Sequence, residues 1–244
     1  RVLFRSTMDE AMFLAASGIR LRVVLIMDIS DGGDVILSKP EIHDLQGLKG
    51  QRVGVESSAL GSFVITRALQ KVGMSVDEIN MVPLELSEQE SAFKSGAVDA
   101  VVTFEPIRSR LLDFGAREIF DSSQIPDEIV DVLVVSEDML LKNQSHPSPD
   151  VLIQGWFHAV RYLEQNPEDA ARRMAPREGI SPEKFLQSLE GLRIPNIEEN
   201  RKLLGKGDLR FQKSLRELHK ILTMNNLLRN NIDPVSLLDD GLVK

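Results

Sequence analysis

Short apolar runs alternate with amphipathic stretches along the first half of the chain. Residues 22–28, 34–38 and 52–55 are β-branched and apolar runs, which are typical of buried strands. Over residues 59–72 the apolar positions recur at helical spacing, and Gly73 follows as a helix stop. The pattern predicts strands that alternate with short helices.

The same alternation continues through the middle of the chain. Further strands are expected over residues 79–84, 98–103 and 117–120, with helices over residues 87–96 and 106–114 between them. A strand, a helix and a following strand form a right-handed crossover that leaves the two strands parallel. The pattern therefore predicts an α/β fold built on a parallel sheet.

After a last predicted strand over residues 131–136, the chain becomes helical. From Pro149 onward the apolar residues keep helical spacing, up to an amphipathic helix over residues 209–228. An α/β unit, from residue 48 to about residue 129, is thus inserted between an early strand pair and this helical region. That layout is the one expected for two lobes joined by two crossings.

Composition excludes several classes of function. Of the 244 residues, 42% are hydrophobic and 27% are charged, which is an ordinary globular mixture. Asp and Glu exceed Lys and Arg by 37 to 29, so a nucleic-acid partner is not expected. No apolar run approaches the length of about 18 residues that spans a bilayer. Cysteine is absent, and no EF-hand, Walker A or dinucleotide pattern occurs, so we predict no metal and no cofactor.

The first six residues read like the in-frame translation of a sequencing adapter. We therefore assign residues 1–6 to a foreign origin, exclude them from the fold, and expect the native amino terminus to be missing. Residues 7–10 then form a capping box, in which Thr7 and Glu10 can satisfy each other's backbone N–H groups. A helix is expected to begin there.

Ligands of open α/β sheets bind beyond the carboxyl ends of the strands, so the loops after strands are the candidate sites. The loop over residues 28–34 offers the carboxylate of Asp28, the hydroxyl of Ser30 and a backbone made accessible by Gly32. An equally good interpretation is a tight acidic turn whose side chains are solvated.

Two further loops follow predicted strands. Ser57, Ser58 and Ala59 begin a helix, where backbone N–H groups suit an anionic oxygen, although plain helix capping is the commoner role. Glu105 lies where it can receive a ligand ammonium or hydroxyl group. The alternative for Glu105 is a favourable interaction with the dipole of the following helix.

No catalytic constellation stands out. The histidines are scattered, and neither H-E-x-x-H nor G-x-S-x-G occurs. Each histidine is more simply a residue of the surface or of a helix face. We therefore expect a protein that is not an enzyme.

Several segments taken together resemble a known family. Residues 48–55 (L-K-G-Q-R-V-G-V), 96–106 (G-A-V-D-A-V-V-T-F-E-P) and 131–135 (D-V-L-V-V) are similar to ABC-transporter substrate-binding proteins of the nitrate/sulfonate/taurine type. Residues 162–171 are also similar to the late helices of that family, so the resemblance covers nearly everything from Thr7 on.

The resemblance implies a two-lobed type II periplasmic-binding fold, with two hinge crossings, that closes on a small ligand. Lobe I would comprise residues 7–47 and 132–244, and lobe II residues 48–131. The first strand and helix of the family would be missing, which would leave the site incomplete. The candidate ligand contacts are Asp28, Ser30 and Gly32, then Ser57, Ser58 and Ala59, then Thr103, Phe104 and Glu105, and as weaker candidates Thr7 and Asp131.

These candidate loops carry several carboxylates and no basic residue, which disfavours bare nitrate. We expect an organic ligand with an amine or ring-nitrogen donor, such as an aminosulfonate or a pyrimidine-like thiamin precursor. The resemblance implies an ABC permease and ATPase as partners, and a periplasmic or lipid-anchored location outside the inner membrane. Two alternatives remain: an enzyme of pyrimidine or menaquinone precursor synthesis on the same fold, or the sensor lobe of a signalling protein.

Overall fold

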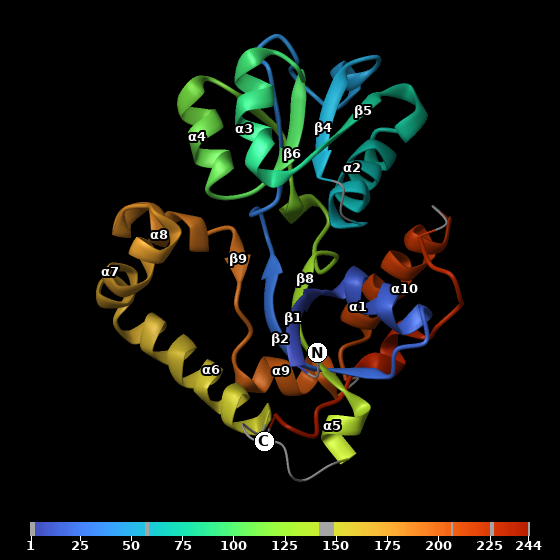
Figure 1. Cartoon of the computed structure of the whole chain (residues 1–244), viewed down its shortest axis with the longest axis vertical. Coiled ribbons are helices and arrows are strands. Elements are labelled where there is room, and N and C mark those ends of the chain that lie inside the picture. The colour runs from blue at the N-terminus through green and yellow to red at the C-terminus, as the bar shows by residue number, and fades with distance from the viewer. Residues whose placement is uncertain (1–2, 57–58, 142–148, 206, 225–226, 244) are drawn as a thin grey trace. The chain divides into compact units, whose positions relative to one another are not determined.

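The computed structural model divides into two compact units, coloured along the chain in Figure 1. Unit 1 comprises Arg1–Ile29, Asp127–Gln187 and Leu192–Lys244, and unit 2 comprises Ser30–Pro126 and Ser188–Gly191. The structure describes residues 3–56, 59–141, 149–205, 207–224 and 227–243.

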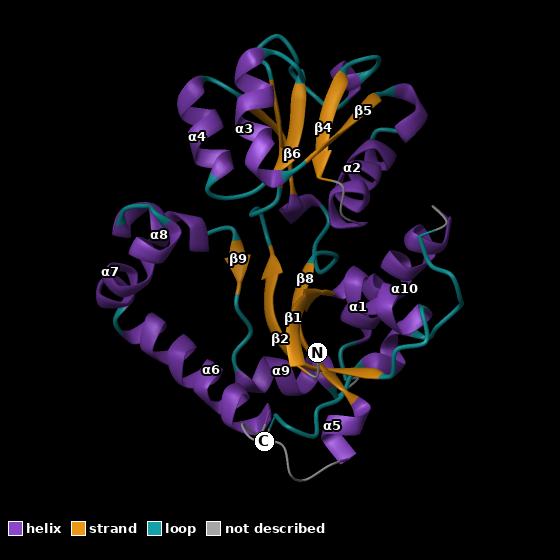
Figure 2. Ribbon diagram, viewed as in Figure 1, coloured by secondary structure: helices purple, strands orange, loops and turns teal. Residues whose placement is uncertain are grey.

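Unit 1 is built on a four-stranded sheet in the order β1-β8-β2-β9 (Figure 2). Both β1 (Leu3–Thr7) and β2 (Leu21–Ser30) run antiparallel to β8 (Val130–Ser136). All but the last residue of β8 are buried, because its Val and Leu side chains lie between two neighbouring strands and the helices. β9 (Leu192–Arg193) is the short outer strand.

Helices make up most of the rest of unit 1. Their amphipathic faces bury Met12, Ile153 and Leu215, among others. The helices are α1 (Met8–Ala16), α5 (Glu137–Leu141), α6 (Pro149–Gln165), α7 (Pro167–Glu178), α8 (Pro182–Leu189), α9 (Ile197–Leu204) and α10 (Leu209–Met224), with the end of α8 counted in unit 2. None of the helices among the described residues combines the length and apolarity that a membrane span needs.

A buried asparagine of α9 completes the hydrogen bonding of β2. The register of β2 against β8 shifts between Ile26 and Asp28. Fully buried Asn200 accepts a hydrogen bond from the Ile26 N–H at 2.8 Å and donates one to the Ile26 carbonyl oxygen at 3.1 Å. The Asn200 amide thus satisfies both backbone groups of Ile26, as a neighbouring strand would.

Unit 2 contains a five-stranded sheet in the order β5-β4-β6-β3-β7. The strands β5 (Asn80–Leu84), β4 (Arg52–Glu56) and β6 (Ala100–Thr103) are parallel, as predicted. β3 (Val35–Ser38), which was expected in the other lobe, joins this sheet and runs antiparallel to both β6 and β7 (Arg117–Asp121). No crossover helix precedes β3, so nothing in the chain turns it parallel to its neighbours.

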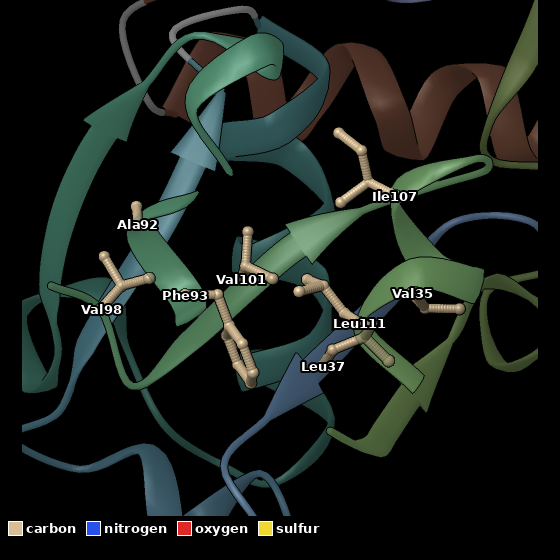
Figure 3. Close-up of a cluster of buried hydrophobic side chains, with 8 residues drawn as sticks. All are labelled: Val35, Leu37, Ala92, Phe93, Val98, Val101, Ile107 and Leu111. Carbon is tan, nitrogen blue, oxygen red and sulfur yellow. The ribbon is translucent and has the colours of Figure 1, made fainter. Parts of the chain in front are cut away.

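The two faces of this sheet are covered by different helices. α3 (Leu86–Ser95) and α4 (Ile107–Phe114) pack on one face, and α2 (Ala59–Lys71) packs against β4 and β6. Figure 3 shows the side chains buried beneath α3 and α4, which come from alternate positions of β3, from β6 and the turn before it, and from the inner faces of the two helices. They are Val35, Leu37, Ala92, Phe93, Val98, Val101, Ile107 and Leu111.

The unit boundaries differ from those expected at residues 47/48 and 131/132. Residues 30–47 belong to unit 2, because β3 pairs on both edges there and every one of its side chains is buried. The second crossing lies between Pro126 and Asp127, and residues 188–191 also belong to unit 2. Residues 3–6, which were expected to lie outside the fold, form most of β1 through backbone pairing with β8.

Candidate ligand-binding site

Three candidate residues of unit 1 lie side by side at one end of its sheet. Thr7 ends β1 and pairs with Asp131 of β8, and Asp131 pairs on its other side with Asp28 of β2. The antiparallel register brings together three residues that are far apart in the sequence. We call Thr7, Asp28 and Asp131 the unit 1 row.

The unit 1 row is acidic. Asp131 is 9% exposed, whereas Asp28 is half-buried. Asp131 accepts a hydrogen bond from Arg5 Nε at 2.9 Å. The Arg5 guanidinium also forms an ion pair with Asp131, so the charge of this carboxylate is balanced.

Sequence reasoning missed Asp9, which follows Thr7 in the first turn of α1. Asp9 is 3% exposed, and burial raises the pKa of its carboxyl group to about 6. Its Oδ2 atom is buried without a hydrogen-bond partner. The capping box predicted for residues 7–10 assigned no role to Asp9. In the structure Glu10 accepts the Thr7 N–H at 3.4 Å, as that capping box predicts.

The loop between β2 and β3 belongs to unit 2 and is held by its own hydrogen bonds. The hydroxyls of Ser30 and Ser122 are 2.7 Å apart, and the Gly32 N–H donates to the Ser122 hydroxyl oxygen at 2.7 Å. The Asp34 N–H donates to the Ser30 hydroxyl oxygen at 3.1 Å. Gly32 has a φ of +102°, which favours glycine. The tight-turn interpretation therefore fits this loop, and Ser122 is a supporting residue that the sequence did not reveal.

Two further contacts fix the same loop. Arg108 of α4 donates from Nη1 to the Gly32 carbonyl oxygen at 3.1 Å and forms an ion pair with Glu118 at 2.9 Å. The Asp31 N–H donates to the carbonyl oxygen of Gly191 at 2.9 Å. Arg108 thus brings a basic group to a loop whose own residues carry none, and Glu118 balances its charge.

The three candidate residues at the end of β6 differ in burial and in hydrogen bonding. Thr103 is 1% exposed, and its hydroxyl oxygen has no hydrogen-bond partner. Phe104 is half-buried. Glu105 accepts hydrogen bonds from the Ser109 hydroxyl at 2.9 Å and the Ser109 N–H at 3.2 Å. The structure thus shows Glu105 bonded at the start of α4, and ligand binding by Glu105 stays a prediction.

Strand pairing brings these segments of unit 2 to one edge of its sheet. Val35, at the start of β3, is paired with Thr103 on one side and with Asp121 on the other. Ser122 follows Asp121 directly, and the parallel strands β4 and β6 end at the same edge. We call the loop of residues 30–34 together with residues 103–105 the unit 2 edge.

The third candidate segment is described only in part. Ser57 and Ser58 lie outside the described residues, and α2 begins at Ala59. Gly61 in the first turn packs tightly, because a Cβ atom there would lie 2.8 Å from the Glu56 carbonyl oxygen. Anion binding at this helix start stays a prediction. Among the residues that the structure describes, no group of three His, Asp or Glu side chains is placed to hold a metal ion.

A family model for NMT1/THI5-like proteins matches residues 7–170, which is more than half of the chain. The chain belongs to the NMT1/THI5-like family. The resemblance to substrate-binding proteins of the nitrate/sulfonate/taurine type is thereby confirmed.

Similarity to individual relatives is partial. A candidate binding protein of Brucella abortus (strain 2308) is 29% identical over 97 residues, which cover 40% of this chain and 30% of that protein. The chain therefore matches less than a third of this curated relative's length.

Solved structures confirm the two-lobed α/β fold class. The periplasmic aliphatic sulphonate binding protein of Escherichia coli superposes with a TM-score of 0.77 at 19% identity, over 99% of this chain and 81% of that chain. The desulfurization enzyme DSZB, in a complex with biphenyl-2-sulfinic acid, superposes with a TM-score of 0.73 at 16% identity, over 100% of this chain and 84% of that chain. At these identities the likeness concerns the fold alone, and that fold serves both a binding protein and an enzyme.

Proposed function

We propose that this protein is the solute-binding receptor of an ABC importer, which closes its two units around a small organic ligand. One observation carries the proposal: candidate residues from distant parts of the sequence gather at the end of the sheet in each unit. Thr7, Asp28 and Asp131 form the unit 1 row, while Ser30 and Thr103 belong to the unit 2 edge. Family membership and the likeness to a sulphonate-binding protein support the same function.

The charges of the unit 1 row favour a particular class of ligand. Asp28 and Asp131 supply two carboxylates at adjacent register positions, and Arg5 forms an ion pair with that of Asp131. Carboxylates attract a ligand that carries an amine or another N–H donor and repel a simple anion. We infer an aminosulfonate, a related organic acid or a pyrimidine-like molecule as ligand.

Binding is favoured over catalysis. A protein that only binds and releases its ligand needs no base paired with a nucleophile. Neither the unit 1 row nor the unit 2 edge contains a histidine. Enzymatic activity is the second candidate function, because DSZB shares the fold. A receptor of this kind would work in the periplasm, or anchored to the outer side of the inner membrane, with a permease and an ATPase as partners.

The proposal can be tested by ligand-induced thermal stabilisation of the 244-residue chain. We would compare taurine, 4-amino-5-hydroxymethyl-2-methylpyrimidine and nitrate. Binding raises the free energy of unfolding by RT ln(1 + [L]/Kd), or about 2.7 kcal/mol at a hundredfold excess over Kd. We expect at least one of the two organic compounds to stabilise the protein and nitrate not to.

Glu105→Ala and Ser109→Ala provide a matched pair for the same assay. Ser109→Ala removes the hydroxyl bond to Glu105 and keeps the bond from the Ser109 N–H, whereas Glu105→Ala removes both bonds together with the carboxylate. We expect Glu105→Ala to abolish the ligand-induced shift and Ser109→Ala to keep it. Stabilisation by nitrate alone, or by none of the compounds, would refute the proposed function. An unchanged shift in Glu105→Ala would remove Glu105 from the site.

A further inference from the structure

Gln89 lies beside the end of β6 on the face of the unit 2 sheet that α3 covers. Figure 3 shows Val101 of β6 in the same cluster as Ala92 and Phe93 of α3. Side chains alternate along a strand, so Thr103 points to the same face as Val101. Residues three and four apart share a helix face, so Gln89 faces β6 together with Ala92 and Phe93.

One hydrogen bond fixes how the Gln89 amide is oriented. Its Nε2 donates to the Val102 carbonyl oxygen at 3.2 Å. Only the nitrogen can donate to a carbonyl oxygen, so the assignment of the two amide ends is determined by chemistry. The Gln89 Oε1 atom is therefore held as an acceptor, and it is buried without a hydrogen-bond partner.

Thr103 contributes a second buried polar atom on this face. Gln89 and Thr103 are each 1% exposed, and neither the Gln89 Oε1 atom nor the Thr103 Oγ1 atom has a partner. A buried polar atom without a partner lowers stability, because it has lost its hydrogen bonds to water. Two such atoms on neighbouring elements, next to the loop of a candidate site, call for a functional explanation.

We propose that Gln89 and Thr103 form a neutral polar subsite for one edge of the ligand. Gln89 Oε1 accepts a hydrogen bond from a ligand N–H or O–H group. The Thr103 hydroxyl can donate or accept, so it pairs with the adjacent ligand atom. This subsite rests on the proposed function and extends it to a residue that the sequence analysis did not select.

The surroundings determine the chemistry that the subsite can take. Ala92, Phe93 and Val101 are buried and apolar, so a charged group placed there would lose its hydration without gaining a counter-ion. An uncharged edge with a donor beside an acceptor fits, such as an amide or an amino group next to a ring nitrogen. A sulfonate or an ammonium group does not fit, which favours the pyrimidine-like class over an aminosulfonate at this position.

The test measures binding by titration calorimetry with the 244-residue chain. The probes are 4-amino-5-hydroxymethyl-2-methylpyrimidine, its 4-dimethylamino analogue, which lacks the donor, and taurine. The variants Gln89→Leu and Thr103→Val remove the two polar groups at nearly constant volume. Thr103→Ser keeps the hydroxyl, and Thr66→Val is a matched control whose hydroxyl donates to the Ser62 carbonyl oxygen outside the site.

We expect Gln89→Leu and Thr103→Val each to weaken binding of the aminopyrimidine at least tenfold, with Thr103→Ser and Thr66→Val close to wild type. The dimethylamino analogue should bind wild type and Gln89→Leu equally. The ligand-free Thr103→Val protein should unfold at or above the wild-type temperature, because it removes a buried atom without a partner. Gln89→Leu also removes the hydrogen bond to the Val102 carbonyl oxygen, so it should unfold below the wild-type temperature.

Other results would overturn the subsite. Equal affinity of all variants for the aminopyrimidine would show that the two atoms have no part in binding. Wild-type binding of taurine without the aminopyrimidine would overturn the neutral-edge specificity while leaving the receptor function standing. Binding of none of these probes would instead refute the proposed function, and the subsite with it.

Discussion

Asn200 provides a direct test of how α9 holds β2 in unit 1. Its side chain is fully buried and makes hydrogen bonds to both backbone groups of Ile26. It also donates to the carbonyl oxygens of Pro195 at 3.0 Å and Asn196 at 3.3 Å. The substitution Asn200→Leu keeps the size of the side chain and removes every one of these bonds.

The expected loss follows from the groups that remain unpaired. The Ile26 N–H and carbonyl groups stay buried in β2 after the substitution, since Ile26 is 0% exposed. Each buried backbone group without a partner costs about 1–3 kcal/mol. We therefore expect the free energy of unfolding to fall by about 4 kcal/mol, a large fraction of the ~5–15 kcal/mol that stabilises a typical domain.

Urea unfolding monitored by fluorescence measures this loss. The single tryptophan, Trp156, lies on α6 in unit 1, so the signal reports the unit that contains Asn200. Asn196→Ala is the matched control, because exposed Asn196 caps the same helix by accepting the N–H groups of Glu198 and Glu199. Loss of such a cap costs about 1 kcal/mol.

The comparison of the two variants can refute the reasoning. If Asn200→Leu costs no more than Asn196→Ala, with an unchanged dependence on urea, the Asn200 bonds do not determine how β2 is held.

The carboxyl groups of Asp9 and Asp99 should give the free energy of unfolding opposite dependences on pH. Burial raises the pKa of Asp9 from 3.8 to about 6, so its stabilising contribution is present below about pH 4 and is lost as the pH rises through 6. Asp9→Asn should therefore be more stable than wild type by about 3 kcal/mol at pH 8 and similar to it at pH 4. If the melting temperatures of the two proteins follow parallel curves against pH, this expectation is contradicted. Hydrogen bonds from Arg52 and Lys39 lower the pKa of Asp99 well below its ordinary value, so its contribution is present above about pH 4 and is lost as the solution becomes more acidic. Asp99→Asn should cost about 2 kcal/mol at pH 7 in urea unfolding, and the difference should shrink towards pH 2; a constant difference would exclude the ion pairs as its cause.

Much of the fold was predictable because buried apolar residues recur along the sequence with the period of a strand or a helix. The apolar run of β8 and the capping signals of α1 both lie where the pattern placed them. The pattern could not show which sheet a strand joins. β3 reads as a buried strand in either unit, and only its pairing with β6 and β7 assigns it to unit 2.

Candidate residues that lie at the ends of strands could be predicted from the sequence. The unit 1 row follows from the positions of Thr7, Asp28 and Asp131 at strand ends, although only the register shows that they are neighbours. Gln89 left a weaker signal, a polar residue on the inner face of an amphipathic helix. Asp9 was hidden because an acidic residue in a first helical turn already has an explanation in the helix dipole.

The hydrogen bond from the Asp31 N–H to the Gly191 carbonyl oxygen has a consequence for anyone who dissects this protein by recombinant expression. A gene fragment encoding residues 30–126 would omit residues 188–191, which belong to the same unit. The excised piece would lose the acceptor for Asp31, and the backbone of Gly33 would lose its close neighbour Gly191. Unit 2 is thus one folded body encoded by two separate stretches of the gene, and expressing it alone requires joining the short stretch to the long one.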